Sequence, residues 1–456
     1  MINTINPVTE VVEARFDAHS PDQVEQLLQA AAVAQRQWAL TPLDERLPLL
    51  NRVAEILRQR KQEFARMITL EMGKPIVEAE AEVEKCAVTC DFYAANAKRF
   101  LDDMAVASNA SESVVVFDPL GIVLAIMPWN YPFWQFVRFA APALAAGNGA
   151  LLKHANNVPQ CALALEEVLK QAGAPEGLVP TLLVEASEVA GLIADPRVAA
   201  VTLTGSTAVG KIVAAQAGAV MKKQVLELGG SDPFIVLADA DIDKAAEVAV
   251  KARFTNTGQS CICAKRFLVE ASVADRFVAA MRELTAKLKV GDPTQRDTAI
   301  GPMARGNLRD ELHGQVQRTV AAGAQLLLGG KPMDGPGYFY EPTILDHVTP
   351  DMPAAREETF GPVAAVIRVK DAEEAVRLAN ATEFGLGAAL WTTDLERAKL
   401  LARRIEAGAV FINGLVASDA RLPFGGIKQS GYGRELGEFG IREFTNIKTV
   451  WIGPSR

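Results

Sequence analysis

The feature that most restricts the fold of this chain is a long alternation of strand-like and helix-like segments. The first strand-like runs are residues 150–152, 181–184 and 198–203. The helical patterns between and around them are residues 159–172 and 187–194. A second alternation begins near residue 230 and continues to a strand at 410–413. Strands that alternate with helices form parallel sheets covered by helices on both faces, so we predict two doubly wound α/β units.

The region before this alternation carries helix signals. Residues 20–23 form a capping-box pattern, with Ser as the cap and Pro at the first helical position. Thr41-Pro42 predicts a second helix start of the same kind, and Gly73 predicts the end of a third helix. We therefore expect a helical layer up to about residue 103.

Two further strand-like segments lie outside the alternation. Residues 113–127 contain two β-branched or apolar runs around a turn at 118–121, which predicts a hairpin or a strand-turn-strand. The tail at 448–452 is also strand-like and needs the edge of another strand to pair with.

The composition is that of an ordinary soluble globular protein. Of the 456 residues, 49% are hydrophobic and 22% are charged. The net charge is -8 and there is no basic stripe, which argues against binding to nucleic acid. The longest apolar region, residues 121–152, is interrupted by prolines and polar residues, which argues against a membrane span. The length suggests about two to four domains.

The five cysteines favour a reducing compartment. Their odd number and wide spacing do not suggest a disulfide framework, and the N-terminus lacks a signal-peptide pattern, so we expect a cytoplasmic protein. Cys86 and Cys90 are four residues apart on one predicted helix face. No second ligand pair and no histidine lies near them, so we expect packing there and no metal site.

Cys261 is the best candidate for a nucleophile. It lies on a loop between an apolar helix at 242–254 and a strand at 266–269, where a rigid scaffold can aim a reactive group. A second segment, Leu226-Glu227-Leu228-Gly229-Gly230, ends a strand with a carboxylate and two glycines. This pattern suits a base held where backbone approaches closely.

A glycine turn at 205–211 follows a strand and opens a helix. Its spacing is almost that of a P-loop, but Ile212 stands where a hydroxyl is needed for magnesium, which argues against an NTPase. The turn still suits a diphosphate, because free N–H groups at a helix N-terminus point at it. A Rossmann fingerprint at 431–436 fails because Leu436 replaces the last glycine.

The segments 256–261 (Asn-Thr-Gly-Gln-Ser-Cys) and 227–230 (Glu-Leu-Gly-Gly) together resemble the active-site signature of the aldehyde dehydrogenase superfamily. The resemblance covers nearly the whole chain. It implies that Cys261 is the nucleophile, that Glu227 activates water, and that Asn130 in the segment 128–132 stabilises the oxyanion. The presence of Glu227 favours hydrolysis to a free acid over transfer to coenzyme A.

The same resemblance implies a binding site for NADP, NAD or both. The residues that it places there are Trp129, Lys153, Asn156, Gly205, Ser206, Leu228, Glu358 and Phe360. Members that prefer NAD commonly have Glu where this chain has Asn156. A neutral amide beside Lys153 would tolerate a 2′-phosphate, so we expect NADP to be accepted.

For the substrate, the chain is most similar to bacterial NAD(P)-dependent succinate-semialdehyde dehydrogenases. Arg138 and Ser418 match residues that contact the far carboxylate there, whereas Thr255 replaces a second arginine. Other short aliphatic or carboxylated aldehydes remain an alternative, as does a non-catalytic coenzyme-binding protein. Cys263 forms a Cys-x-Cys pattern with Cys261, which in some of these enzymes gives a reversible disulfide; packing is the other reading.

The resemblance also implies a domain organisation. Residues 1–100 and 120–229 would form the dinucleotide-binding domain and residues 230–430 the catalytic domain. Residues 101–119 and 431–456 would form a small bridging sheet that makes a homodimer or homotetramer. The predicted fold is thus two doubly wound α/β domains and an oligomerisation sheet.

Overall fold

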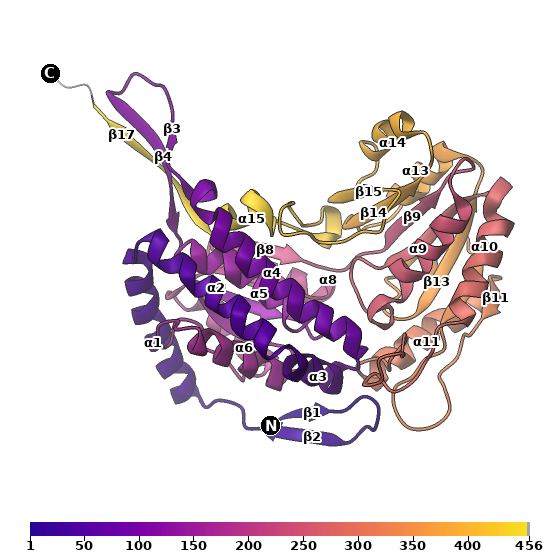
Figure 1. Cartoon of the computed structure of the whole chain (residues 1–456), viewed down its shortest axis with the longest axis horizontal. Coiled ribbons are helices and arrows are strands. Elements are labelled where there is room, and N and C mark those ends of the chain that lie inside the picture. Colours follow the sequence, from indigo (N-terminus) through magenta and orange to yellow (C-terminus); the bar gives the residue numbers. More distant parts are fainter. Residues whose placement is uncertain (454–456) are drawn as a thin grey trace.

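A computed structural model describes residues 1–453, which form two α/β bodies and a projecting three-stranded arm (Figure 1). The first body is built on a five-stranded sheet of order β16-β8-β7-β5-β6. Its strands are β5 (Ile122–Met127), β6 (Gly149–His154), β7 (Val198–Thr204), β8 (Lys223–Glu227) and the short antiparallel edge strand β16 (Gly431–Tyr432). Four of the five strands are parallel, as predicted for a doubly wound unit.

Alternation along β5 explains why helices cover both faces of this sheet. Val123 and Ala125 pack into the core on one face, whereas Ile122 and Leu124 pack into the core on the other. Side chains alternate across a strand, so a strand buried on both faces is apolar throughout. The helices involved are α1 (Pro21–Leu40), α2 (Leu43–Gln59), α3 (Lys61–Met72), α4 (Ile76–Leu101), α5 (Trp134–Ala145), α6 (Pro159–Gln171), α7 (Val189–Ala194) and α8 (Thr207–Ala219).

The N-terminal helix signals are largely confirmed. Ser20 and Gln23 form the predicted capping box of α1, and Gly73 ends α3 with a φ of 81°. The prediction that Thr41 caps α2 is wrong. Thr41 ends α1, its hydroxyl donates to the Gln37 carbonyl, and Pro42 takes the cap position of α2. The helical layer begins at Pro21, as predicted, and is preceded by a hairpin that was not predicted, formed by β1 (Ile2–Ile5) and β2 (Val12–Phe16).

The predicted strand at 181–184 is wrong. Thr181 makes only an isolated bridge to Leu152. Its N–H donates to the Glu166 carboxylate. Leu182 still donates to the Leu152 carbonyl, but both backbone groups of Leu183 bond to His19, so the pairing with β6 does not continue.

The second body is built on a seven-stranded sheet of order β11-β12-β13-β10-β9-β14-β15. Its strands are β9 (Asp232–Val236), β10 (Ala264–Glu270), β11 (Gln325–Leu328), β12 (Thr343–Asp346), β13 (Val363–Val369), β14 (Gly387–Trp391) and β15 (Ala409–Ile412). Along β10, Phe267 and Leu268 pack into cores on opposite faces. The larger covering helices are α9 (Ile242–Phe254), α10 (Ala271–Ala286), α11 (Gly306–Ala321), α13 (Ala372–Asn380) and α14 (Leu395–Ala402).

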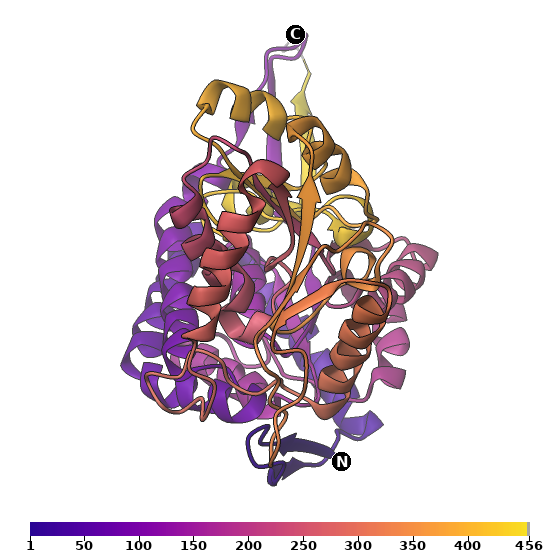
Figure 2. The same ribbon diagram turned by 90° about the vertical axis from the view of Figure 1, so that its right-hand side faces the viewer.

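The arm is a three-stranded sheet formed by segments far apart in the sequence. Strand β17 (Thr445–Ile452) pairs antiparallel with β4 (Glu112–Pro119), which pairs with β3 (Met104–Ala105). The C-terminal strand thus finds the edge that it needs. Because β4 and β5 belong to different sheets, residues 113–127 form a strand-turn-strand and not a hairpin. Figure 2 shows the arm at one end of the molecule and the β1–β2 hairpin at the other.

The two bodies meet where β8 leads into β9 through residues 228–231. Parallel sheets bind ligands beyond the carboxyl ends of their strands. The carboxyl ends of β7 and β8, at Thr204 and Glu227, reach this junction. No helix among residues 1–453 is both long enough and apolar enough to cross a membrane.

Candidate active site

The loop that carries Cys261 is held in an unusual backbone conformation. After α9, Asn256 and Thr257 have φ angles of 54° and 56°, in the left-handed region that non-glycine residues seldom occupy. Asn256 is held from both ends: its N–H donates to Glu78 at 2.6 Å and its Nδ2 donates to the Asn130 carbonyl at 2.9 Å. Such strain persists only where the surroundings over-determine it, and it concentrates at functional sites.

A buried guanidinium joins this loop to a second one. Arg253, fully inaccessible to solvent, donates to the carbonyl oxygens of Gly258, Thr359 and Gly361. The loop before Cys261 and the loop around Glu358 and Phe360 are therefore fixed relative to each other. Five N–H donors in a rigid fork suit arginine to this task.

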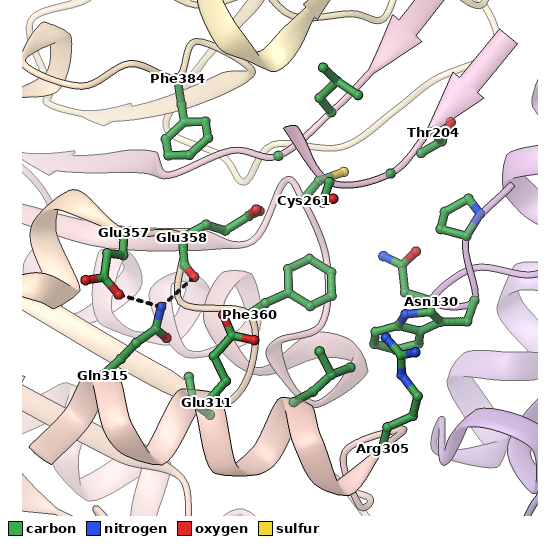
Figure 3. Close-up of a pocket in the computed structure, with 18 of the residues that line it drawn as sticks. Asn130, Thr204, Cys261, Arg305, Glu311, Gln315, Glu357, Glu358, Phe360 and Phe384 are labelled. Carbon is green, nitrogen blue, oxygen red and sulfur yellow. Dashed lines mark hydrogen bonds between the residues drawn. The ribbon is translucent and has the colours of Figure 1, made fainter. Parts of the chain in front are cut away.

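Cys261 lies between two cavities. The first, of about 500 Å³, is lined by residues from both bodies and is shown in Figure 3. The second, of about 340 Å³, lies beside α4 and α5. Cys261 and Gln135 line both cavities. A nucleophile at such a junction can meet one ligand from each side.

The first cavity gathers most of the residues predicted to bind a dinucleotide. Six of the eight line it: Trp129, Gly205, Ser206, Leu228, Glu358 and Phe360. Trp129 and Phe360 meet edge to face, with ring centroids 5.8 Å apart. Ser206 caps α8 by accepting from the N–H of Val209, so the N-terminus of this helix opens toward the cavity.

Glu358 is positioned by the Gly229-Gly230 segment. Its Oε1 accepts from the Gly230 N–H at 3.0 Å and lies 3.5 Å from Lys265 Nζ. A Cβ at Gly229 would lie 2.4 Å from Glu358 Oε2, so only glycine leaves room for this carboxylate. A helix N-terminus for diphosphate, a carboxylate for ribose hydroxyls and two aromatic walls form a donor set that fits a nicotinamide dinucleotide.

The two remaining predicted cofactor residues lie apart from this cavity. Lys153 is the penultimate residue of β6 and donates to Asn156 Oδ1 at 2.9 Å. Asn156 Nδ2 in turn donates to Glu185 at 2.8 Å. Burial lowers the pKa of Lys153, which the Glu185 carboxylate opposes. A carboxylate therefore stands beside the neutral amide, which the sequence pattern did not indicate.

Asn130 is buried in the wall of the first cavity. Its Nδ2 donates to the Gln259 carbonyl at 3.0 Å, and its Oδ1 accepts from Gln135 at 3.1 Å. This oxygen contact orients the amide so that its nitrogen faces the Cys261 loop. An amide nitrogen carries two hydrogens, and one is not used by Gln259.

The Cys261 thiol is in a mixed electrostatic environment. Burial raises its pKa to about 12, and the positive charges of Lys265 and Arg138 oppose that rise. Lys265 is itself fully buried and donates to the carbonyl oxygen of Cys261 at 2.7 Å. The cations therefore favour the thiolate, which is the nucleophilic form.

Glu227 is buried at the end of β8 and does not line either cavity. Neither carboxylate oxygen has a hydrogen-bond partner among residues 1–453. Burial raises the pKa of Glu227, and the nearby negative charge of Glu435 adds to this, whereas Arg138 and Arg434 oppose it. An unsatisfied carboxylate of raised pKa suits a base that acts on water.

The second cavity contains the predicted substrate residues. Arg138, on α5, and Ser418 both line it, as do Thr255 and Cys263. Arg138 is also buried in an ion pair with Glu435 and lies over the Phe424 ring. Cys263 is a buried free thiol whose sulfur lies 3.7 Å from the Thr255 carbonyl. Its redox role stays a prediction.

Several residues of the site were missed by sequence reasoning. They are Lys85 and Gln135 in the second cavity, Arg305 in the first, and the buried groups Arg253, Lys265 and Glu435. Glu435 lies within the glycine-containing segment 431–436, so its position was a usable signal. Lys85 contacts a residue 333 positions away, and no local pattern marks it. Among the described residues, no group of histidines, cysteines or carboxylates could hold a metal ion.

Comparisons with known proteins agree with this geometry. The model of the aldehyde dehydrogenase family matches residues 1–450. A probable NADP(+) succinate-semialdehyde dehydrogenase of Synechocystis is 53% identical over 451 residues, covering 99% of each chain. The NAD(P)+ succinate semialdehyde dehydrogenase of Escherichia coli is 51% identical, covering 98% of this chain and 97% of its own.

A solved structure has the same fold over its full length. The succinic semialdehyde dehydrogenase of Streptococcus pyogenes, solved with NADP+, is 38% identical, with a TM-score of 0.97 and complete coverage of both chains. The predicted fold of two doubly wound α/β units and a small third sheet is therefore confirmed. A family match over nearly the whole chain, with full-length relatives that share about half of its residues, makes this chain a member of the aldehyde dehydrogenase family.

Proposed function

We propose that this protein oxidises succinate semialdehyde to succinate with NADP or NAD as the hydride acceptor. The observation that carries the proposal is the position of Cys261 between two cavities of different chemistry. The first has the donor set of a dinucleotide site, and the second contains Lys85 and Arg138, which suit an anionic substrate. The names of the relatives, which are about half identical over their full length, support the same substrate and cofactors.

In the proposed first step, the Cys261 thiolate adds to the aldehyde carbon. Negative charge then develops on the aldehyde oxygen, where the Asn130 amide and the Cys261 backbone N–H stabilise it. Lys265 and Arg138 favour the thiolate against the cost of burial. When bound, the nicotinamide supplies the hydride acceptor that converts the thiohemiacetal to a thioester.

In the proposed second step, Glu227 removes a proton from water as the water attacks the thioester. The carboxylate has to turn toward Cys261, since it does not line either cavity. Gly425 leaves room for the carboxylate in its observed position, because a Cβ there would lie 2.8 Å from Glu227 Oε1. Cys261 then leaves as the thiolate, and the carboxylic acid is released.

The first test measures initial rates of NADPH or NADH formation with succinate semialdehyde and with butyraldehyde, which has the same carbon chain but no carboxylate. We expect kcat/KM to be at least about 10-fold higher for succinate semialdehyde, because a charged contact is lost with butyraldehyde. Equal turnover of the two aldehydes would support aldehyde oxidation but would contradict succinate semialdehyde as the specific substrate. Turnover of neither aldehyde would favour a non-catalytic coenzyme-binding protein.

We further propose that the protein forms a dimer or tetramer through its arm. The exposed apolar side chains on this sheet support the proposal, because contiguous exposed apolar surface marks interfaces. They include Met104, Ile447, Val450, Trp451 and Ile452. Sedimentation of Trp451→Lys beside the wild type tests the interface.

The five cysteines are free thiols, which supports a reducing compartment such as the cytoplasm.

A further inference from the structure

The charged side chains that line the second cavity differ in whether they have a partner within the chain. Its two carboxylates are both used: Glu82 accepts from the N–H groups of Phe133 and Trp134, and Glu78 accepts from the N–H of Asn256. Glu82 is also paired with the buried Lys74. Neither carboxylate forms an ion pair with a cation that lines the cavity, although the negative charge of Glu82 acts on Lys85 from a distance.

The three cations of the cavity differ in what holds them. Arg138 is paired with the buried Glu435, so much of its charge is compensated. Lys251 lies at an exposed position, where water screens its charge. Lys85, on α4, is half-buried and makes no ion pair with any carboxylate in the described chain, residues 1–453.

The surroundings of Lys85 hold its ammonium in place without a direct ion pair. Its Nζ donates to Ser418 Oγ at 2.6 Å and lies 4.3 Å from the centre of the Trp134 ring. Burial lowers the pKa of Lys85 to about 8, and the positive charge of Arg138 adds to this effect, whereas the negative charges of Glu82 and Asp419 oppose it. A partly desolvated cation without a directly paired carboxylate is costly, and an anionic ligand would reduce that cost.

We propose that Lys85 is a specificity-determining residue that, together with Ser418, binds the carboxylate at the far end of the substrate. The ammonium has three donors, and only one is used by Ser418. Because the Ser418 hydroxyl accepts from Lys85, its own hydrogen is free to donate to the same carboxylate. Position 255, which also lines this cavity, is an uncharged threonine whose hydroxyl donates to the Lys251 carbonyl at 2.8 Å. The cation that complements Arg138 therefore comes from α4.

This assignment rests on the proposed function, and the experiment separates the two. Wild type, Lys85→Met, Lys85→Gln and Lys85→Arg are assayed for kcat and KM with succinate semialdehyde and with butyraldehyde. The two neutral variants should lower the ratio of kcat/KM for succinate semialdehyde to that for butyraldehyde by about 10- to 100-fold, chiefly through KM. Lys85→Arg, which retains the charge, should recover most of that ratio.

Lys98→Met is the matched control. Lys98 lies on the same helix, is exposed and pairs with Asp44 outside the cavity, so its loss removes one charge without touching the site. The ratio should stay at the wild-type value. Thermal unfolding of every variant shows that the fold is retained, and two neutral replacements of different polarity guard against one that fails to fold.

An unchanged ratio in folded neutral variants would overturn the role of Lys85 while the proposed function stands. An equal loss with both aldehydes would also overturn it, because a residue that only shapes the site does not distinguish a carboxylate from a methyl group. If the wild type itself does not oxidise succinate semialdehyde, the proposed function fails and the assignment of Lys85 fails with it.

Discussion

The two cavities that meet at Cys261 are built in different ways. The first is formed mainly by loops that follow strands or begin helices, such as Gly205-Ser206 after β7 and the glycines after β8, and by one face of α11. The second is formed by side chains on the faces of long helices, with Lys85 on α4 and Arg138 on α5, and by a loop at 415–418. Six of the eight predicted cofactor residues line the first cavity. The predicted Arg138 and Ser418 line the second, which also contains Lys85, a cation that no motif indicated.

This difference has a physical cause. A dinucleotide site uses backbone N–H groups and close approach, which require particular residues at fixed local spacing and so leave a motif. A carboxylate pocket needs only a charge at the right place in space, and any element that packs there can provide it. A cofactor site is therefore easier to recognise from sequence motifs than a substrate pocket is.

Cys261 lines both cavities, and its replacement by alanine should reduce catalytic activity more than any other change. We expect kcat/KM to fall by at least about 1,000-fold with either aldehyde, because the covalent path is lost. Formation of NADPH is the measurement. Cys263→Ser, two residues away in the same cavity, is the control and should retain most activity. If Cys261→Ala and Cys263→Ser were equally active, Cys261 would not be the nucleophile.

Glu227→Gln should separate the two halves of the reaction. We expect kcat to fall by about 100- to 1,000-fold, with a burst near one NADPH per active site, because hydride transfer precedes hydrolysis. The raised pKa of Glu227 in the folded protein means that the base form appears only as pH rises above the usual range of a carboxyl group. Wild-type kcat should therefore increase with pH there, and this rise should vanish in the variant. A variant with normal turnover and no burst would contradict the role.

Arg138→Met tests whether that arginine serves structure as well as substrate. Removing one partner of a buried ion pair leaves Glu435 uncompensated and should cost about 3–5 kcal/mol in the free energy of unfolding. Denaturant unfolding measures the cost, and the double variant Arg138→Met/Glu435→Gln should recover part of it. Activity should fall with both aldehydes, in contrast to the selective loss in Lys85→Met. Normal stability with a selective loss of succinate semialdehyde turnover would make Arg138 a substrate ligand alone.

Glu185→Gln tests the preference for NADP over NAD and has the smallest expected effect. The Glu185 carboxylate accepts from Asn156, beside the lysine that we expect to attract a 2′-phosphate. Its removal should raise the ratio of kcat/KM for NADP to that for NAD by about 2- to 5-fold at low salt, and less at high salt, since Glu185 is exposed. Glu188→Gln, three residues further along, is the control. A ratio that does not change would place Glu185 away from the bound phosphate.

Sequence patterns predicted the two doubly wound units and the C-terminal strand that needed an edge, and short motifs marked Cys261 and six proposed cofactor residues that line one cavity. Each of these depends on local order: periodicity, capping, glycine turns and short motifs. The failed strand at 181–184 shows the limit, because tertiary contacts to Glu166 and His19 took the backbone groups that a strand would have used.

Only the tertiary structure decided how the charges pair. It placed Lys85 beside Ser418, Arg138 against Glu435, and Glu185 against Asn156. These partners are distant in the chain, up to 333 residues apart, and a charge can be met by any element that folds near it. The pairing of charged groups depends on their distance in space and on their burial, and neither quantity can be read from the local sequence.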